Sequence, residues 1–271
     1  MESFTMHIDR RVRESPAYHN PFFDNCHDPQ KQTSVVQVAD MAVNWYFVTK
    51  SFGISASIYT GVIAQELMRS DPEKEKVLKD LLVESARISG DDLGIGHESL
   101  YPRGGGREIP YNERVHYRLW GDLTKTLLSA SQHPTTINGL KIEEAQSHGQ
   151  VRPETVGLVK MIEGEFRSVE GGAAVYQTVE SIALNIVLAY SGLIKRLQKS
   201  GKVTLTERDL IYLKIHEPLE REHDLQSTHI IDLVDQYSDG KNRSIIKTKV
   251  DEMSGLFGNF WDAMNKIVFN E

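Results

Sequence analysis

The stretch GGAAVYQTVESIALNIVLAYSGLI, residues 171–194, decides the fold class, because it is long and apolar and carries one charged residue, Glu180. The apolar character extends over several helical turns, and residues 173–199 are predicted to form one helix. A lone carboxylate on an apolar helix is costly to bury unless it is neutralised, paired with a cation or bound to a metal ion. Glu180 is therefore the first candidate site residue. A structural ion pair is the alternative role.

Most of the remaining chain also has apolar residues at helical spacing, and strand signals are nearly absent. Asp71-Pro72 is a helix start signal. The apolar segment that precedes it is expected to be divided at Gly53 into two helices. Segment 89–111 is rich in Gly and Pro and is expected to be irregular, with Asn112 capping the next helix. The expected helices cover 35–49, 55–70, 72–88, 113–129, a segment from 153, 173–199, a segment after a Thr206/Asp209 capping box, and 243–268.

These elements predict an all-α fold, a bundle of about seven to eight helices in a single domain. Residues 1–33 are rich in Pro, Asn, Asp and His and are expected to form an irregular N-terminal arm, followed by a helical domain over 34–271. We find no internal repeat and no linker that would divide the chain.

Composition restricts the kinds of partner. A net charge of −7 and a pI near 5.8 argue against nucleic acid or an anionic membrane as a partner. The longest apolar stretch is interrupted by Asn185 and Ser191, which argues against a membrane span. With Cys26 as the single cysteine, no internal disulfide is possible and a cytoplasmic location is expected. Any metal site must use His and carboxylate ligands.

The segment YLKIHEPLEREHDLQSTH, residues 212–229, contains such ligands. His216, Glu220 and His223 are spaced i, i+4, i+7 and fall within about 60° of one another on a helix. Imidazole and carboxylate together suit iron, manganese or zinc, and a set with several carboxylates favours iron. The alternative is a solvated helix face rich in charge. Pro218 lies within this segment and should kink the helix.

Glu113 and His116 repeat the Glu-x2-His pairing in the first half of the chain, as di-iron carboxylate bundles do. We therefore predict six metal ligands: Glu113, His116, Glu180, His216, Glu220 and His223. His97 is the rival of His116 and would use Asp91 or Asp92 as its carboxylate partner. The sequence does not separate the further carboxylate candidates Glu66, Glu84, Asp91 and Asp92.

In order and spacing, residues 35–235 resemble the haem-oxygenase-like di-iron oxidase and oxygenase family. That family has an acidic-Gly segment, here Asp91-Asp92-Leu93-Gly94, and then a His with Leu three residues on, here His116 and Leu119. A lone Glu in an apolar helix follows, here Glu180, and then His-x3-Asp-x2-His, here residues 216–223. Two departures are Glu220 in place of Asp and a longer glycine-rich insertion before His116.

The resemblance implies a haem-oxygenase-like fold with two Fe(II) ions that activate O2 to oxidise a small substrate. Family members act on amino acids, their derivatives or fatty acids, often in natural-product pathways, by N-oxygenation, desaturation or C–C cleavage. The expected partners are an amino-acid-like substrate and O2, and a homodimer is allowed. A ferritin-like di-iron protein is the first alternative, since it uses Glu-x2-His twice. The second is a metal-free pocket enzyme or binding protein of the same architecture.

Overall fold

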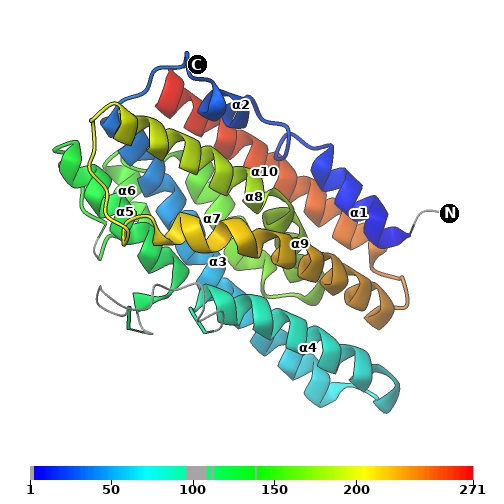
Figure 1. Ribbon diagram of the computed structural model, residues 1–271. Helices are drawn as coiled ribbons and strands as arrows, with labels where there is room; N and C mark the ends of the chain where they lie inside the picture. The colour runs from blue at the N-terminus through cyan, green and yellow to red at the C-terminus, as the bar shows by residue number, and fades with distance from the viewer. Residues whose placement is uncertain (1–2, 96–108, 111–112, 138, 271) are drawn as a thin grey trace.

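Helix α8 (Val169–Lys199) runs through the middle of the bundle and packs against α9 on one side and α10 on the other (Figure 1). The Ser168 hydroxyl caps it by accepting a hydrogen bond from the Gly171 backbone N–H. The Gly171-Gly172 pair therefore lies inside α8, which begins four residues before the predicted start at residue 173. A Cβ at Gly172 would collide with the ring of Tyr59, so glycine here allows α3 to approach α8 closely.

The computed structural model describes residues 3–95, 109–110, 113–137 and 139–270. All regular structure in these ranges is helical, and the helices form a single compact domain, which confirms the predicted all-α fold. The described part of the chain has ten helices, more than the predicted seven to eight. Besides α8 they are α1 (Phe4–Arg13), α2 (Pro21–His27), α3 (Val35–Arg69), α4 (Pro72–Asp92), α5 (His116–Ala130), α6 (Ile142–Ser147), α7 (Pro153–Glu165), α9 (Ile211–Tyr237) and α10 (Arg243–Phe269).

Helix α3 corrects the predicted break at Gly53, because it is continuous from Val35 to Arg69. Its start is a capping box in which Ser34 and Gln37 satisfy each other's backbone N–H groups. Gly53 is buried in the middle of this helix, beside α4. The packing of a long buried face outweighs the cost of about 1 kcal/mol that glycine adds to a helix.

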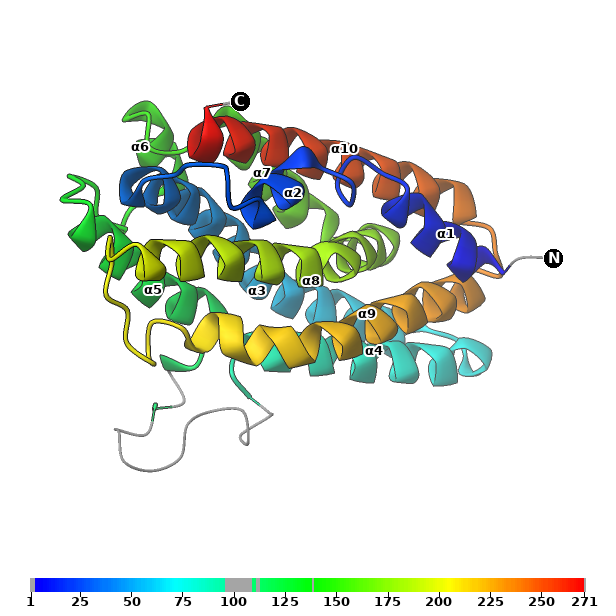
Figure 2. The same cartoon turned by 45° about the horizontal axis from the view of Figure 1, so that its top comes forward.

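The N-terminal arm is also corrected, because residues 1–33 contain two helices. Asn20 caps α2 with its side chain, and Pro21 occupies the first helical position. Helix α1 buries Ile8 and Val12, spaced i, i+4, and packs against α8, α9 and α10. Figure 2 shows α1 lying across the end of the bundle near α9 and α10. The arm is thus part of the packed core.

Helices α8, α9 and α4 lie in succession across one side of the molecule (Figure 2), and α9 packs on both of its neighbours. Helix α8 is long and apolar enough to cross a membrane by length and composition, but 78% of its most apolar window is buried in the bundle. A buried core helix has this same character. The important consequence for the site is that α9 faces Glu180 on one side and the end of α4 on the other.

Candidate metal centre

Glu180 lies on the buried part of α8 and is 4% exposed. From α9, His216, Glu220 and His223 are 6%, 3% and 3% exposed, and all four side chains line one cavity. Helix α9 is continuous through Pro218, so the triplet keeps one face toward this cavity. The structure therefore brings together the four predicted ligands of the second half of the chain.

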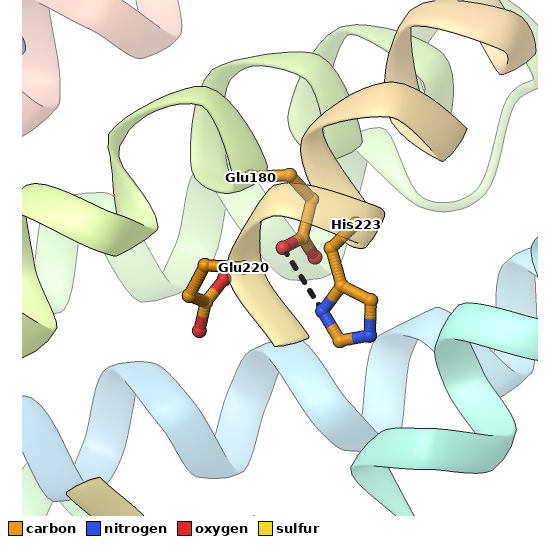
Figure 3. A group of neighbouring side chains, drawn as sticks. All are labelled: Glu180, Glu220 and His223. Atoms are coloured by element: carbon orange, nitrogen blue, oxygen red, sulfur yellow. Dashed lines mark ion pairs between the residues drawn. The ribbon is translucent and has the colours of Figure 1, made fainter. Parts of the chain in front are cut away.

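Three of these side chains form a compact group. Glu180, Glu220 and His223 each have a potential ligand atom, and these atoms lie within 4.8 Å of one another. Figure 3 shows Glu180 and His223 reaching toward each other from α8 and α9, with Nδ1 of His223 3.5 Å from Oε2 of Glu180. Metal–ligand bonds of about 2.0–2.2 Å require ligand atoms within about 4.4 Å of one another. A metal ion would fit after shifts of a few tenths of an ångström.

The ends of α4 and α5 supply a second set of side chains. Nδ1 of His116 lies 3.1 Å from Oδ1 of Asp92, and Nε2 of His223 lies 3.2 Å from Oδ2 of Asp91. The imidazole rings of His116 and His216 meet with their centroids 4.4 Å apart. Asp91 and Asp92, which the sequence did not distinguish from other candidates, thus join five of the six predicted ligands.

The way α4 ends explains why this acidic pair reaches the site. Helix α4 continues past the predicted end at residue 88 to Asp92, and Gly94 then adopts a left-handed conformation with φ +75°. The Ile95 N–H donates to the Gly90 carbonyl at 2.8 Å, the pattern of a glycine-terminated helix. A Cβ at Gly94 would lie 2.5 Å from the Cβ of Arg114. Gly94 was the signal that could have placed both aspartates on a helix.

Glu113 is the predicted ligand that the structure places elsewhere. Its carboxylate accepts a hydrogen bond from Arg208 at 2.6 Å and is 39% exposed, in a separate surface pocket. Helix α5 begins at His116, with Val115 as its N-cap, and not at residue 113. The i, i+3 relation that would align Glu113 with His116 on one helical face therefore does not apply. Asn112, the predicted cap, lies outside the described residues.

Three other candidates also lie away from the site or outside the described residues. Glu66 accepts a hydrogen bond from the Tyr237 hydroxyl at 3.0 Å. Glu84 pairs with Arg87 at 3.5 Å, and neither glutamate lines the cavity. His97 lies outside the described residues.

Burial controls the protonation of the site carboxylates. Burial raises the pKa of Glu180 against the opposing effect of His223, and it raises the pKa of Glu220 well above its ordinary value, with Glu180 adding to the rise. Burial likewise raises the pKa of Asp92 to about 7, although His223 opposes the shift. Oδ2 of Asp92 and Oε2 of Glu220 are buried without a hydrogen-bond partner among the described residues. These carboxylates fit an environment that supplies positive charge.

The imidazoles of His216 and His223 have pKa values shifted in opposite directions. Burial, reinforced by the nearby His116, lowers the pKa of His216 well below its ordinary value, so this ring is neutral. Its Nδ1–H donates to the Tyr212 carbonyl at 2.7 Å, which leaves the Nε2 lone pair for a metal ion. Burial alone would lower the pKa of His223, but Glu180 and other carboxylates raise it well above its ordinary value. The surrounding carboxylates therefore favour the protonated form of His223.

The cavity that joins these side chains is small and half apolar. Its volume is about 50 Å³. A water molecule needs about 10–15 Å³ of such space, so the cavity has room for about three to five water-sized groups. Apart from Thr49, the rest of the lining is apolar or aromatic: Trp45, Phe52, Val179, Ala183, Ile186, Val187 and Tyr212. Metal ions and a diatomic gas fit this volume, whereas an amino-acid-sized molecule requires side chains to move.

Two comparisons, with protein families and with curated proteins, found no match. Its chemistry is therefore inferred from the geometry of the site.

Proposed function

We propose that the cavity between α4, α5, α8 and α9 binds two iron ions and that the protein is a non-haem di-iron oxidase or oxygenase. The observation that carries this proposal is a set of buried donors, of which all but Asp91 line one cavity, while Asp91 contacts His223. Four carboxylates (Asp91, Asp92, Glu180 and Glu220) and three imidazoles (His116, His216 and His223) are each buried or nearly so. Exposed acidic clusters are common without metal, but a buried set of this size is costly unless cations balance it.

The charge of the donor set supports two ions over one. When ionised, four carboxylates carry four negative charges, which two divalent cations neutralise while the imidazoles stay neutral. One divalent ion would neutralise only two of these charges, and the other two carboxylates would have to be neutralised in another way. Mixed nitrogen and oxygen donors with several carboxylates favour iron among the biological metals. The di-iron carboxylate proteins that are built from helical bundles use donor sets of this kind.

The reaction that we propose is the O2-dependent oxidation of a small amino-acid-like substrate, in keeping with the family that the sequence resembles. Bound iron would supply the electrons that activate O2. The apolar wall formed by Trp45, Phe52 and Val187 would exclude water from the reacting atoms. His216, held by the Tyr212 carbonyl, would keep its ring orientation when metal binds.

Two observations weigh against the alternatives. A ferritin-like centre needs Glu-x2-His in both halves of the chain, but Glu113 pairs with Arg208 away from His116. A metal-free hydrolase of this architecture needs a nucleophilic cysteine. Cys26 is buried, burial raises the pKa of its thiol, and it does not line the cavity.

Anaerobic titration with Fe(II), followed by exposure to O2, tests the proposal. The wild-type chain should bind two ions and consume O2 once iron is bound. Glu180→Gln should reduce the number of tightly bound ions, whereas Glu113→Gln should keep both, because this carboxylate is 39% exposed and lies outside the cavity. If the wild-type chain bound no iron, or if both variants lost iron equally, the proposed site would be wrong.

A further inference from the structure

A hydrogen-bonded chain of side chains lies directly behind the metal-facing residues and ends on α1. Nη2 of Arg13 donates to Oδ2 of Asp224 at 2.7 Å, and the Ser181 hydroxyl donates to Oδ1 of the same carboxylate at 3.1 Å. Nε2 of Gln177 donates to the Ser181 oxygen at 2.7 Å. Ser181 and Gln177 are buried, at 5% and 0% exposed. This series of hydrogen bonds therefore links α1, α8 and α9 through polar contacts in and beside the core.

Two residues of this hydrogen-bonded series are sequence neighbours of candidate metal ligands. Ser181 follows Glu180 on α8, and Asp224 follows His223 on α9. The hydrogen bond between Ser181 and Asp224 thus ties α8 to α9 at the level where Glu180 and His223 face each other (Figure 3). A slip of either helix would break this bond and separate the two candidate ligands together.

Arg13 completes the arrangement from α1. Its Nε lies 2.9 Å from both oxygens of Asp9, which fixes the guanidinium while its other end holds Asp224. The planar, forked guanidinium suits this double role, and an ammonium group reproduces only part of it. Arg13 is also the cation that balances Asp224, which would otherwise add a negative charge beside a group of four carboxylates. Helix α1 is held in place by buried Ile8 and Val12.

We propose that Arg13 is a positioning residue of the metal site: through Asp224 and Ser181, it holds α8 and α9 in the register at which Glu180 and His223 share an ion. This inference rests on the proposed metal site. Helix α1, which lies in the segment predicted to be an irregular arm, thereby becomes part of the functional unit. Groups that orient metal ligands indirectly contribute about 10- to 100-fold to metal affinity.

Helix α1 offers a matched control for this role. Arg11 makes a bidentate pair with Asp251 of α10, neither residue lines the cavity, and the side chains of Arg11 and Arg13 are both 36% exposed. Arg11→Met and Arg13→Met each remove one interhelical ion pair of α1. A role limited to docking α1 would give the two variants the same phenotype.

The experiment compares wild type, Arg11→Met, Arg13→Met and Arg13→Lys. Anaerobic binding of Co(II) is followed by its visible spectrum, and Tm is measured without metal. Arg13→Met should weaken Co(II) binding about tenfold or more and alter the spectrum, while Arg11→Met leaves both unchanged at a similar Tm. Arg13→Lys should restore part of the affinity and provides the test if Arg13→Met does not fold.

The outcomes separate the two proposals. If wild type binds Co(II) and all three variants match its affinity and spectrum, Arg13 serves only to dock α1 and the inference is overturned. Equal weakening in Arg11→Met and Arg13→Met also overturns it. If wild type itself binds neither Co(II) nor Fe(II), the proposed function fails first.

Discussion

The two halves of the candidate site are built in different ways. The α8/α9 half uses residues in the interiors of two long buried helices, where the periodicity of the chain determines which side chains share a face. The α4/α5 half uses Asp91 and Asp92 from the last turn of α4 and His116 from the first residue of α5. The comparison teaches that ligands within helices can be predicted from spacing, whereas ligands at helix ends depend on where each helix stops.

The largest expected effect contrasts one histidine from each half. His216→Ala should weaken the binding of one of the two irons by more than about 100-fold, beyond the effect of a residue that only orients a ligand. His116→Ala should weaken it by about 10- to 100-fold, because the carboxylate of Asp92, next to the lost ring, remains as a donor. Anaerobic Fe(II) titration measures both. If His216→Ala left iron binding unchanged while His116→Ala abolished it, the ferritin-like arrangement would gain support.

A smaller effect concerns Asp92 and the pH dependence of the metal-free protein. Because burial raises its folded-state pKa to about 7, the folded protein binds one more proton than the unfolded chain between the unfolded pKa, near 4, and about pH 7. Stability from this group is therefore present at low pH and lost as pH rises toward about 7. Denaturation of the EDTA-treated protein should show a loss of about 2 kcal/mol between about pH 5 and pH 6.5.

Asp92→Asn is the variant that checks this assignment. It should flatten that pH dependence, whereas Glu113→Gln should leave it as in the wild type. An unchanged slope in Asp92→Asn would show that other groups control stability in this range. Added Fe(II) should stabilise the wild type more at the higher pH, because protons and metal compete for the same carboxylates.

The smallest expected effect is on folding stability, and it is tested at two glycines near Asp92. Gly94→Ala should destabilise the protein by about 1–2 kcal/mol, because alanine is strained in the left-handed conformation. Its Cβ would also collide with Arg114. Gly53→Ala should instead stabilise it by about 0.5–1 kcal/mol, since the nearest atom to the new Cβ, Cβ of Asp92, is at an ordinary 3.6 Å. Urea denaturation measures both, and a destabilised Gly53→Ala would contradict the helical packing described for α3.

The distinction between residues inside helices and residues at helix ends also explains how much of the fold was predictable. The central helix α8, the Asp71-Pro72 start of α4 and the start of α10 at Arg243 follow from apolar spacing and capping signals. The Thr206/Asp209 hydrogen bonds form as predicted, at 2.7 Å, but on the turn that precedes α9. The all-helical single domain was therefore predictable, and its boundaries only in part.

The N-terminal helices were missed although their signals are present. Asn20-Pro21 has the same form as Asp71-Pro72, a capping residue before a proline at the first helical position. Helix α2 has only seven residues, however, and helices that short are stable only when they pack against the rest of the protein. The polar contacts of α1 with α9 are equally invisible in the sequence, since Arg13 and Asp224 are 211 positions apart.

Glu113 was predicted as a ligand, but the structure places it away from the site. Its spacing to His116 is right for a shared helical face, but that spacing means nothing unless both residues are helical, and α5 begins at His116. Asp91 and Asp92 were harder to rank, because the role of Asp91 depends on a contact with His223 of α9 across 132 positions, and that of Asp92 on a contact with His116 of α5. The buried carboxylate that sequence did single out, Glu180, was conspicuous because its neighbours are apolar.

The buried carboxylates also have a consequence for the lifetime of the protein in the cell. If they bind metal as proposed, the metal stabilises the folded state by mass action, by about 2.7 kcal/mol per ion at one hundred times the dissociation constant. A chain made under iron starvation would populate unfolded states more often and be degraded faster. Its abundance would then follow the iron supply without any change in transcription.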